Sequence, residues 1–385
     1  MTVSTGLPRV LVVMGTRPEA IKLAPVMRAL RARPELQTRL ALTGQHSDLV
    51  DQVLQVFGIV PDWDLAIMRE GQDLYDVAHG CLDGLRRVAD QYKPDVIVVQ
   101  GDTASVFFGA LVAFFQRARV AHVEAGLRSG DKWQPYPEEI FRRMTGVITD
   151  FHFAPTAGAR ANLVREGTPA DTVFVTGNTV VDALLAIAGA DRPVTDDALR
   201  SAIGSGRRLV LVTAHRRESF GAPIREAFGA LREIADRYPD TVLVYPVHPN
   251  PNVRGPADEV LSGHDRILLT TPLDYFDLVH ALRHATLAIT DSGGIQEEAP
   301  SFGTPTLVLR EVTERPEGVE AGVAVLVGTD RNRILTAAAG VLDAGADRAE
   351  GSRFNPYGDG NAAARIADVL AHALAAAPRQ TADLP

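Results

Sequence analysis

Short runs of aliphatic and β-branched residues alternate with segments of helical length along most of this 385-residue chain. This alternation predicts βαβ units and therefore parallel sheets. Most of the runs lack polar alternation, which indicates strands that helices cover on both faces. The expected strands are 9–14, 40–43, 95–100, 120–123 and 172–176 in the first half, and 208–213, 241–247, 266–270, 286–290, 306–309 and 323–327 in the second.

The two series of strands predict two α/β domains, each a doubly wound Rossmann-like sheet, with a cleft between them. The length suits this, because it allows two domains of roughly 150–200 residues. We expect the first domain over 1–189, a linker with one helical turn over 190–206, and the second domain over 207–360. The Ala-rich segment 361–385 has apolar residues at helical spacing and predicts a closing helix.

Composition narrows the classes of function. The net charge of −9 argues against a nucleic-acid surface, which needs clustered cations. Cys81 is the one cysteine, which excludes an internal disulfide and a thiolate metal cluster and suits the reducing cytoplasm. The start does not have the pattern of a signal peptide, and no run approaches the ~20 apolar residues of a spanning helix, so we expect no membrane insertion.

The first candidate site follows strand 9–14. The chain continues as GTRPEAIK, in which Pro18 suits the first position of a helix. Arg17 and Lys22 then flank a helix N-terminus, whose free N–H groups attract anions. An anion site is one interpretation, and a plain turn with two solvated cations is the other. A single glycine is too few for a Walker loop or a GxGxxG fingerprint.

Acidic residues follow the next strands of this sheet. Asp102 comes after strand 95–100 and Glu124 after strand 120–123, with Arg128 close behind. Because the carboxyl ends of parallel strands share one edge, these residues predict a common functional site. A helix cap is the alternative role for Asp102.

The segment PEEIFRR, 137–143, predicts the start of a helix with acids in its first turn. Glu138 and Arg142 are four residues apart, as are Glu139 and Arg143, so each pair shares a helix face. Surface ion pairs are one interpretation of this spacing. The neighbouring motifs favour a functional role for one pair.

The second half carries further motifs at strand ends. His215 and two arginines follow strand 208–213, which indicates phosphate contact, proton transfer or merely solvated loop charge. His248 lies in the turn HPNPN, as a ligand contact or simply a turn residue.

The segment DSGGIQEE, 291–298, follows strand 286–290 and is the most specific of these motifs. Ser292 can cap a helix, while Gly293 and Gly294 let a phosphate approach backbone N–H groups. Glu298, about one turn later, could reach ribose hydroxyls, and Arg315 follows another strand. A plain glycine turn is the alternative.

Taken in order, GTRPEAIK, TGQH, GDT, EAGLR, PEE, HRRESFG, HPNP, DSGGIQEEAPS and TERPE resemble the non-hydrolysing UDP-N-acetylglucosamine 2-epimerases over nearly the whole chain. The resemblance implies a GT-B-like fold, a C-terminal helix that packs back on the first domain, and a homodimer. It implies that the nucleotide and diphosphate are bound by Arg17, Lys22, His248, Ser292, Gly293, Gly294, Glu298 and Arg315. It places Asp102, Glu124, Glu138, Arg142 and His215 around the reacting sugar.

The chain departs from the family pattern at several positions. Phe141 replaces the usual Asn before Arg142. Leu278 stands where an aromatic residue commonly packs near the uracil, and Phe276 is the expected substitute. Some bacterial members bind a second substrate molecule as an activator near TGQH. Asp48 and Gly71 replace a Gln and an Arg that contribute there, so this regulation is not expected.

The implied reaction explains the residue types. C2 of the hexose has no adjacent carbonyl, so its proton is not acidic, and elimination of UDP to a 2-acetamidoglucal solves the problem. Such a route needs a carboxylate base, an acid on the opposite face, and cations around the diphosphate. It needs neither a metal nor a nicotinamide cofactor. We expect Asp102, Glu124 and Glu138 to share the proton transfers, and Arg142 and His215 to position or stabilise the leaving group.

Other functions remain open from the sequence alone. A GT-B glycosyltransferase would use the same fold and the same UDP site. A hydrolysing epimerase would release UDP and free N-acetylmannosamine, and a sensor would bind the nucleotide sugar without turnover. The sugar itself is either N-acetylglucosamine or a modified relative.

Overall fold

The computed structural model describes residues 6–44, 48–67, 69, 71–190, 192–344 and 354–384, apart from the side chains of Asp48 and Leu49. Its contacts divide the chain into two compact units. The first unit comprises 1–183 and 357–385, and the second comprises 184–356. In the parts of the chain so described, no helix is long and apolar enough to cross a membrane.

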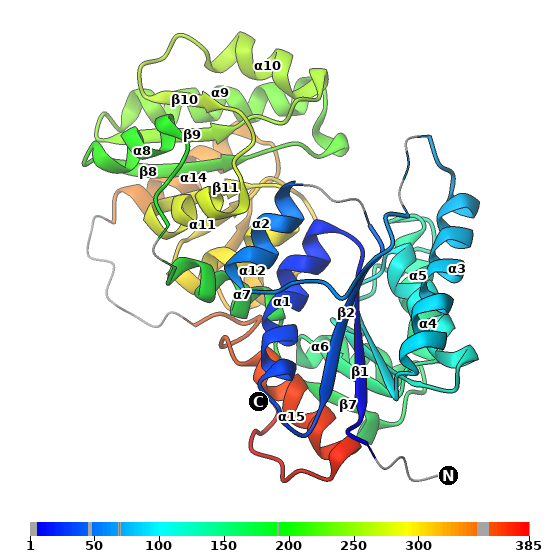
Figure 1. Cartoon of the computed structure of the whole chain (residues 1–385). Helices are drawn as coiled ribbons and strands as arrows, with labels where there is room; N and C mark the ends of the chain where they lie inside the picture. Colours follow the sequence, from blue (N-terminus) through cyan, green and yellow to red (C-terminus); the bar gives the residue numbers. More distant parts are fainter. Residues whose placement is uncertain are drawn as a thin grey trace. The chain divides into compact units, whose positions relative to one another are not determined.

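The first unit is built around one parallel sheet (Figure 1). Its strands are β1 (Arg9–Met14), β2 (Gln37–Leu42), β3 (Trp63–Asp64), β4 (Val96–Gln100), β5 (Arg119–Val123), β6 (Phe151–Ala154) and β7 (Val173–Val175). They lie in the order β3-β2-β1-β4-β5-β6-β7, so the direction of strand addition reverses between β1 and β4. All five residues of β4 are buried, as expected for a strand covered on both faces.

Helices cover both faces of this sheet. They are α1 (Arg17–Arg31), α2 (Asp48–Val56), α3 (Leu74–Tyr92), α4 (Ala104–Phe115), α5 (Glu138–Val147), α6 (Ala157–Arg165), α7 (Thr179–Ala188), which runs into the second unit, and α15 (Ala362–Ala375), with the 3₁₀ turn η1 (Ala170–Thr172). Helix α4 packs between α3 and α5, while α1 packs against α2 and α15 (Figure 1). As the sequence predicts, Pro18 lies in the first turn of α1.

The second unit repeats the same plan. Its strands are β8 (Arg208–Thr213), β9 (Thr241–Pro246), β10 (Ile267–Thr270), β11 (Ala285–Thr290), β12 (Thr306–Val308) and β13 (Ala324–Leu326). Its helices are α8 (Asp197–Gly204), α9 (Ala222–Arg237), α10 (Pro251–Leu261), α11 (Tyr275–His284), α12 (Gly293–Glu298), α13 (Pro316–Glu320) and α14 (Arg331–Leu342), with 3₁₀ turns η2 (Arg217–Ser219) and η3 (Ala299–Phe302). The parallel order β10-β9-β8-β11-β12-β13 reverses between β8 and β11.

The expected α/β class, with two Rossmann-like sheets, is confirmed, and each expected strand is present within a few residues. Two further strands, β3 and β6, were not predicted. Strand β3 has only two residues, and β6 (FHFA) contains no β-branched residue. Residues 190–206, expected as a linker, contain the eight-residue helix α8, whose Leu199 and Ala202 are buried in the core of the second unit.

The C-terminal segment closes the first unit around one buried carboxylate. Asp368 of α15 is 1% exposed and accepts the backbone N–H groups of Gln380 and Thr381, both at 2.8 Å. Arg33, in the turn after α1, contacts its other oxygen at 3.0 Å. Beyond this point the Leu384 N–H donates to the Val175 carbonyl at 2.7 Å. The tail therefore covers the open edge of β7.

Asp368→Asn should destabilise the protein. Burial alone would raise the pKa of Asp368, but the hydrogen bonds from Thr381 and Gln380 and the charge of Arg33 hold it at about 2. A depressed pKa stabilises the fold above the ordinary value near 3.8 and loses that effect as pH falls towards 2. We expect a loss of about 2 kcal/mol in the free energy of unfolding at pH 7.

Urea denaturation at pH 7 and at pH 3 measures this effect, with Asp171→Asn, at an exposed position, as the control. The difference between wild type and Asp368→Asn should shrink at the lower pH. Equal stability of the two proteins at pH 7 contradicts the prediction.

Candidate functional site

The sequence motifs gather where the strand order of each sheet reverses. In the first unit, residues 15–22 follow β1 and residues 101–103 follow β4. In the second unit, residues 214–217 follow β8 and residues 291–298 follow β11. Ligands of open parallel sheets bind outside the carboxyl ends of the strands at such reversals. Each unit therefore has a candidate ligand-binding edge.

Glu124 lies directly after β5 in a strained backbone conformation, with φ +64°. A non-glycine residue in the left-handed region is uncommon and is often found at functional sites. Its side chain is 6% exposed, and both carboxylate oxygens contact the Lys22 ammonium, at 2.6 and 2.8 Å. The Gln100 amide also donates to it. Lys22, expected near the diphosphate, is thus paired with a carboxylate of the proposed acid–base group.

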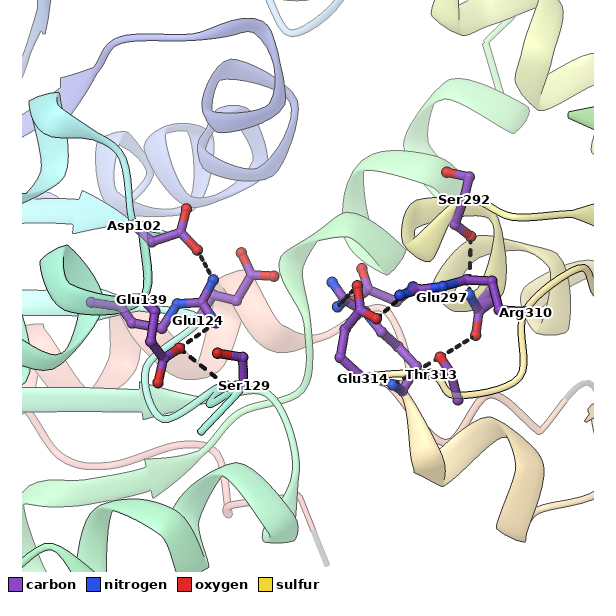
Figure 2. Close-up of polar contacts among 12 residues, drawn as sticks. Asp102, Glu124, Ser129, Glu139, Ser292, Glu297, Arg310, Thr313 and Glu314 are labelled. Atoms are coloured by element: carbon purple, nitrogen blue, oxygen red, sulfur yellow. Dashed lines mark hydrogen bonds and ion pairs between the residues drawn. The ribbon is translucent and has the colours of Figure 1, made fainter. Parts of the chain in front are cut away.

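A second chain of polar contacts runs through Arg142 (Figure 2). One end of its guanidinium donates to Asp102, after β4, and the other contacts Glu139 at 3.3 Å. The same Glu139 oxygen, Oε2, accepts the Ser129 N–H at 3.1 Å. Glu139 is fully buried, and its Oε1 atom has no hydrogen-bond partner within the described part of the chain. The guanidinium therefore bridges two carboxylates of different exposure.

These contacts correct two sequence-based interpretations. Arg142 pairs with Glu139, three residues earlier, and with Asp102, because Glu139 points into the protein from the first turn of α5. Arg143 lies 3.9 Å from Glu166. Helix α4 has Thr103 as its N-cap residue, so Asp102 is not the cap.

The other residues that were expected at this edge of the first unit have different surroundings. Glu138 is the first residue of α5 and is half-buried, as is Arg17 at the start of α1. Arg128 is held by Glu166 through contacts of 2.7 to 3.1 Å. Its guanidinium therefore joins a surface carboxylate instead of the acids at the strand ends. Phe141, which replaces the family Asn, stacks on Phe107 with ring centroids 5.4 Å apart.

In the second unit, Asp291 ties together the two strand ends at the reversal. It follows β11, is 1% exposed, and its Oδ2 accepts the N–H groups of His215 and Arg216, at 2.6 and 2.7 Å. Its other oxygen lies 3.3 Å from Nδ1 of His215. The sequence placed Asp291 in a motif without assigning it a role.

The His215 imidazole lies between this carboxylate and the His248 ring, which stacks on it at 5.6 Å. Burial lowers the pKa of His215, and the charges of Arg216 and His248 lower it further, against the opposing effect of Asp291. These effects favour the uncharged form of His215. The Asp291 carboxylate beside Nδ1 favours the tautomer that carries its proton there, which leaves Nε2 as an acceptor.

Arg315 lies against Gly293 at the start of α12, close to Ser292, Glu297 and Glu314 in Figure 2. A Cβ atom on Gly293 would lie 3.3 Å from the guanidinium carbon, so glycine permits this approach. The guanidinium is held by Glu297 at 2.9 Å and Glu314 at 3.2 Å. Ser292 is the N-cap residue of α12 but makes no capping hydrogen bond with its side chain. Arg315 and the glycines thus meet at one edge, as the sequence predicts.

Two other residues that were expected to contact the nucleotide have buried side chains. Glu298 is 6% exposed and accepts the Tyr275 hydroxyl at 3.1 Å. Phe276, expected as the aromatic substitute near the base, is 2% exposed, and the Arg192 guanidinium covers its ring at 4.0 Å. The ring of Phe276 is therefore not open to stacking in this structure.

Two remaining expectations concern the TGQH segment and bound metals. Gln45 and His46 of TGQH lie outside the described residues, as does the side chain of Asp48, while Gly71 has φ +78°. Within the described ranges, no three His, Cys, Asp or Glu side chains gather as a metal site.

Comparison with known proteins gives one consistent result. The family model for UDP-N-acetylglucosamine 2-epimerase matches residues 28–371. The chain is similar to the UDP-N-acetylglucosamine 2-epimerase of Yersinia pestis, at 47% identity over 94% of this chain and 98% of that protein. It is also similar to the enzyme of the same name from Escherichia coli K12, at 46% identity over the same shares.

Comparison with solved structures gives the same family. A UDP-GlcNAc 2-epimerase from Neisseria meningitidis bound to UDP-GlcNAc matches with TM-score 0.82 and 39% identity, covering 94% of this chain and 99% of that one. S. aureus MnaA with UDP matches with TM-score 0.85 and 42% identity, covering 98% and 100%. A glycosyltransferase of kitacinnamycin, at 14% identity and TM-score 0.64 over 96% and 100%, shares the fold.

Asp291→Asn should impair turnover. The amide keeps one acceptor for the N–H groups of residues 215 and 216 but places an NH₂ group beside Nδ1 of His215, which favours the opposite tautomer. A histidine held in the wrong tautomer loses its catalytic or binding role, so we expect a loss of at least ~10-fold in kcat.

The nitrogen chemical shifts of the His215 ring report the tautomer, and product formation reports kcat. Asp236→Asn is a matched control, because Asp236 contacts the ring of His264 at 3.2 Å from an exposed position. Unchanged kcat in Asp291→Asn contradicts this assignment.

Proposed function

We propose, because the chain belongs to the UDP-N-acetylglucosamine 2-epimerase family, that it interconverts UDP-N-acetylglucosamine and UDP-N-acetylmannosamine. Membership in this family makes the protein an isomerase of nucleotide sugars. The proposal assigns acid–base chemistry at C2 to the first unit and binding of the nucleotide to the second. We retain the expected domain roles on this basis, with the unit boundaries given by the contacts of the chain.

The reaction is an elimination followed by an addition. A carboxylate removes the C2 proton, the electron pair of that bond forms the C1–C2 double bond, and UDP leaves with the electrons of the C1–O bond. A proton then reaches C2 on the opposite face while the diphosphate oxygen rebuilds the bond to C1. Atoms and electrons balance without an oxidant, so the chain has to supply only proton carriers and a binding site for the anion.

One observation carries this assignment: each carboxylate at the neighbouring ends of β4 and β5 has its own cation. Glu124 contacts Lys22 and Asp102 contacts Arg142, while Glu138 begins the helix that supplies Arg142. A cation at each position holds the carboxylate in one orientation, which proton transfer requires. We therefore assign the proton transfers to Asp102, Glu124 and Glu138, with Arg142 positioning Asp102.

The second unit supplies the groups expected around UDP. Arg315 lies against Gly293, beside Ser292 and Gly294, and offers positive charge for the diphosphate. Uncharged His215, with Nε2 as acceptor, can accept a hydrogen bond from the substrate beside the leaving group, and His248 stacks on it. Glu298 and Arg17 keep their proposed places near the ribose and the diphosphate. Phe276 is withdrawn as the stacking partner of the base because it is covered.

Deuterium from solvent should enter C2 at the rate of epimerisation. When the enzyme is incubated with UDP-N-acetylglucosamine alone in deuterated buffer, proton NMR should show a second UDP-sugar and loss of the C2 proton signal. Asp102→Asn should lower the rate by at least ~10²-fold, the usual effect of losing a general acid or base.

Each alternative gives a different product in the same experiment. Epimerisation without entry of deuterium rules out the elimination route. Release of UDP with free N-acetylmannosamine indicates hydrolysis, and no product indicates a glycosyltransferase without its acceptor or a sensor that binds without turnover. A panel of modified UDP-sugars identifies the preferred sugar.

A homodimer through α4 and α5 is part of the proposal. Large apolar side chains are exposed on these packed helices: Phe114 by 58%, Phe115 by 66%, Met144 by 44% and Val147 by 85%. Exposed apolar patches of this kind are typical of interaction surfaces. A second copy of the chain is the occupant that the family resemblance favours.

The double variant Phe114→Glu/Phe115→Glu should therefore be monomeric, because two charges would be buried without partners. Light scattering coupled to gel filtration gives the mass. Val60→Glu, at a residue 74% exposed in the same unit, should leave a dimer unchanged. A monomeric wild type, or a dimeric double variant, contradicts this interface.

The location that suits the proposal is the reducing cytoplasm. Cys81 is buried, and burial raises the pKa of its thiol to about 11. Such a thiol stays protonated and unreactive. It is suited to a compartment where disulfides are rare.

A further inference from the structure

We infer that Glu19 is a positioning residue for the proposed reaction, because its carboxylate joins the turn after β1 to the turn after β4 and thereby fixes Arg17 and Asp102. The inference rests on the proposed function. Neither the composition nor the family motifs assigned a role to this carboxylate.

The Glu19 carboxylate is 2% exposed and accepts hydrogen bonds from Gly15, Thr16 and Thr103. Its Oε2 atom accepts the Gly15 N–H at 2.6 Å. Its Oε1 atom accepts the hydroxyl of Thr16 at 3.0 Å and that of Thr103 at 2.7 Å. Gly15 and Thr16 follow β1, whereas Thr103 follows β4. The carboxylate therefore spans the place where the strand order reverses.

A local helix cap accounts for only part of these contacts, because Glu19 also accepts the Thr16 backbone N–H as in a capping box. Glu19 lies three residues after Thr16, the N-cap residue of α1, a spacing typical of the capping box. A complete capping box would also use the Thr16 hydroxyl for the helix, yet Thr16 makes no side-chain capping bond and donates to Glu19. Thr103, the N-cap residue of α4, also makes no side-chain capping bond.

The hydroxyls of Thr16 and Thr103 thus bind Glu19 and do not cap their own helices. A capping hydrogen bond of this kind contributes roughly 1 kcal/mol. Thr103 lies 84 residues from Glu19 and belongs to another strand end. The hydrogen bond from its hydroxyl therefore connects the two turns. Asp102 directly precedes Thr103, and Arg17 directly follows Thr16, so both proposed functional residues are attached to this junction.

Stability does not explain a carboxylate at this position. Burial raises the pKa of Glu19 to about 7 despite its hydrogen bonds. A raised pKa in the folded state means that ionisation of Glu19 destabilises the fold as pH rises from 4.5 through 7. The Cys81 thiol of α3 is near Glu19 and stays protonated. A neutral side chain of the same shape would therefore preserve the fold at pH 8.

The experiment compares Glu19→Gln, Thr103→Val and Thr103→Ser with wild type at pH 8. Thr103→Val removes the hydroxyl without changing the shape, and Thr103→Ser restores it. We expect kcat to fall at least ~10-fold in Glu19→Gln and Thr103→Val, because small displacements of catalytic groups have such effects. The kcat of Thr103→Ser should stay within ~3-fold of the wild-type value, because the serine hydroxyl restores the hydrogen bond to Glu19.

Two further measurements separate positioning from folding. Calorimetry should give an unchanged Kd for UDP in Thr103→Val and Thr103→Ser, because both variants keep the contacts of Glu19 with Gly15 and Thr16 beside Arg17. The Tm of Glu19→Gln should not fall by more than a few degrees. A Tm and a UDP affinity that fall together with kcat in Thr103→Val would show a structural role and overturn the inference.

The remaining outcomes are also decisive. Wild-type kcat in Thr103→Val, or equal losses in Thr103→Val and Thr103→Ser, overturns the inference while the proposed function stands. No turnover by the wild type instead rejects the proposed function itself. If Glu19→Gln does not fold, the two Thr103 variants decide alone.

Discussion

The reversal of strand order in each parallel sheet is the constraint on which the candidate site depends. Parallel strands are connected by right-handed crossovers, so strands added in opposite directions send their helices to opposite faces of the sheet. The turns that follow the two strands at the reversal therefore run apart. A tie, meaning a buried carboxylate that contacts both turns, holds them together. In the first unit Glu19 joins the ends of β1 and β4. In the second unit Asp291 joins the ends of β8 and β11.

The two ties have the same chemistry but act on different groups. Each is a buried carboxylate that accepts hydrogen bonds from a neighbouring turn, and each adjoins residues proposed to act on substrate. Asp291 fixes a histidine directly, whereas Glu19 acts through Thr103. Burying a carboxylate is unfavourable unless it is well paired. Buried carboxyl groups at both reversals therefore indicate a role in orientation more than in stability.

The sequence predicted the fold well because β-branched runs and glycine-marked turns are local signals. It predicted less of the pairing within the site, because pairing depends on which helix face is buried. The spacing of Glu138 and Arg142 suggested one ion pair, whereas burial of Glu139 selects another. The position of Phe276 suggested that its ring packs near the base. Arg192, 84 residues away in the sequence, covers that ring. Such contacts between distant residues leave no local trace in the sequence.

The C-terminal segment has a consequence for how the chain is made. Residues 357–385 belong to the first unit, where Asp368 contacts Arg33 after α1 and Leu384 contacts β7. Domains generally fold as they emerge from the ribosome, N-terminal first. Here the unit that begins the chain lacks its helix α15 and the cover of β7 until residues 357–385 have been synthesised. Until then the edge strand β7 is open, and α1 has no partner for the face that packs against α15.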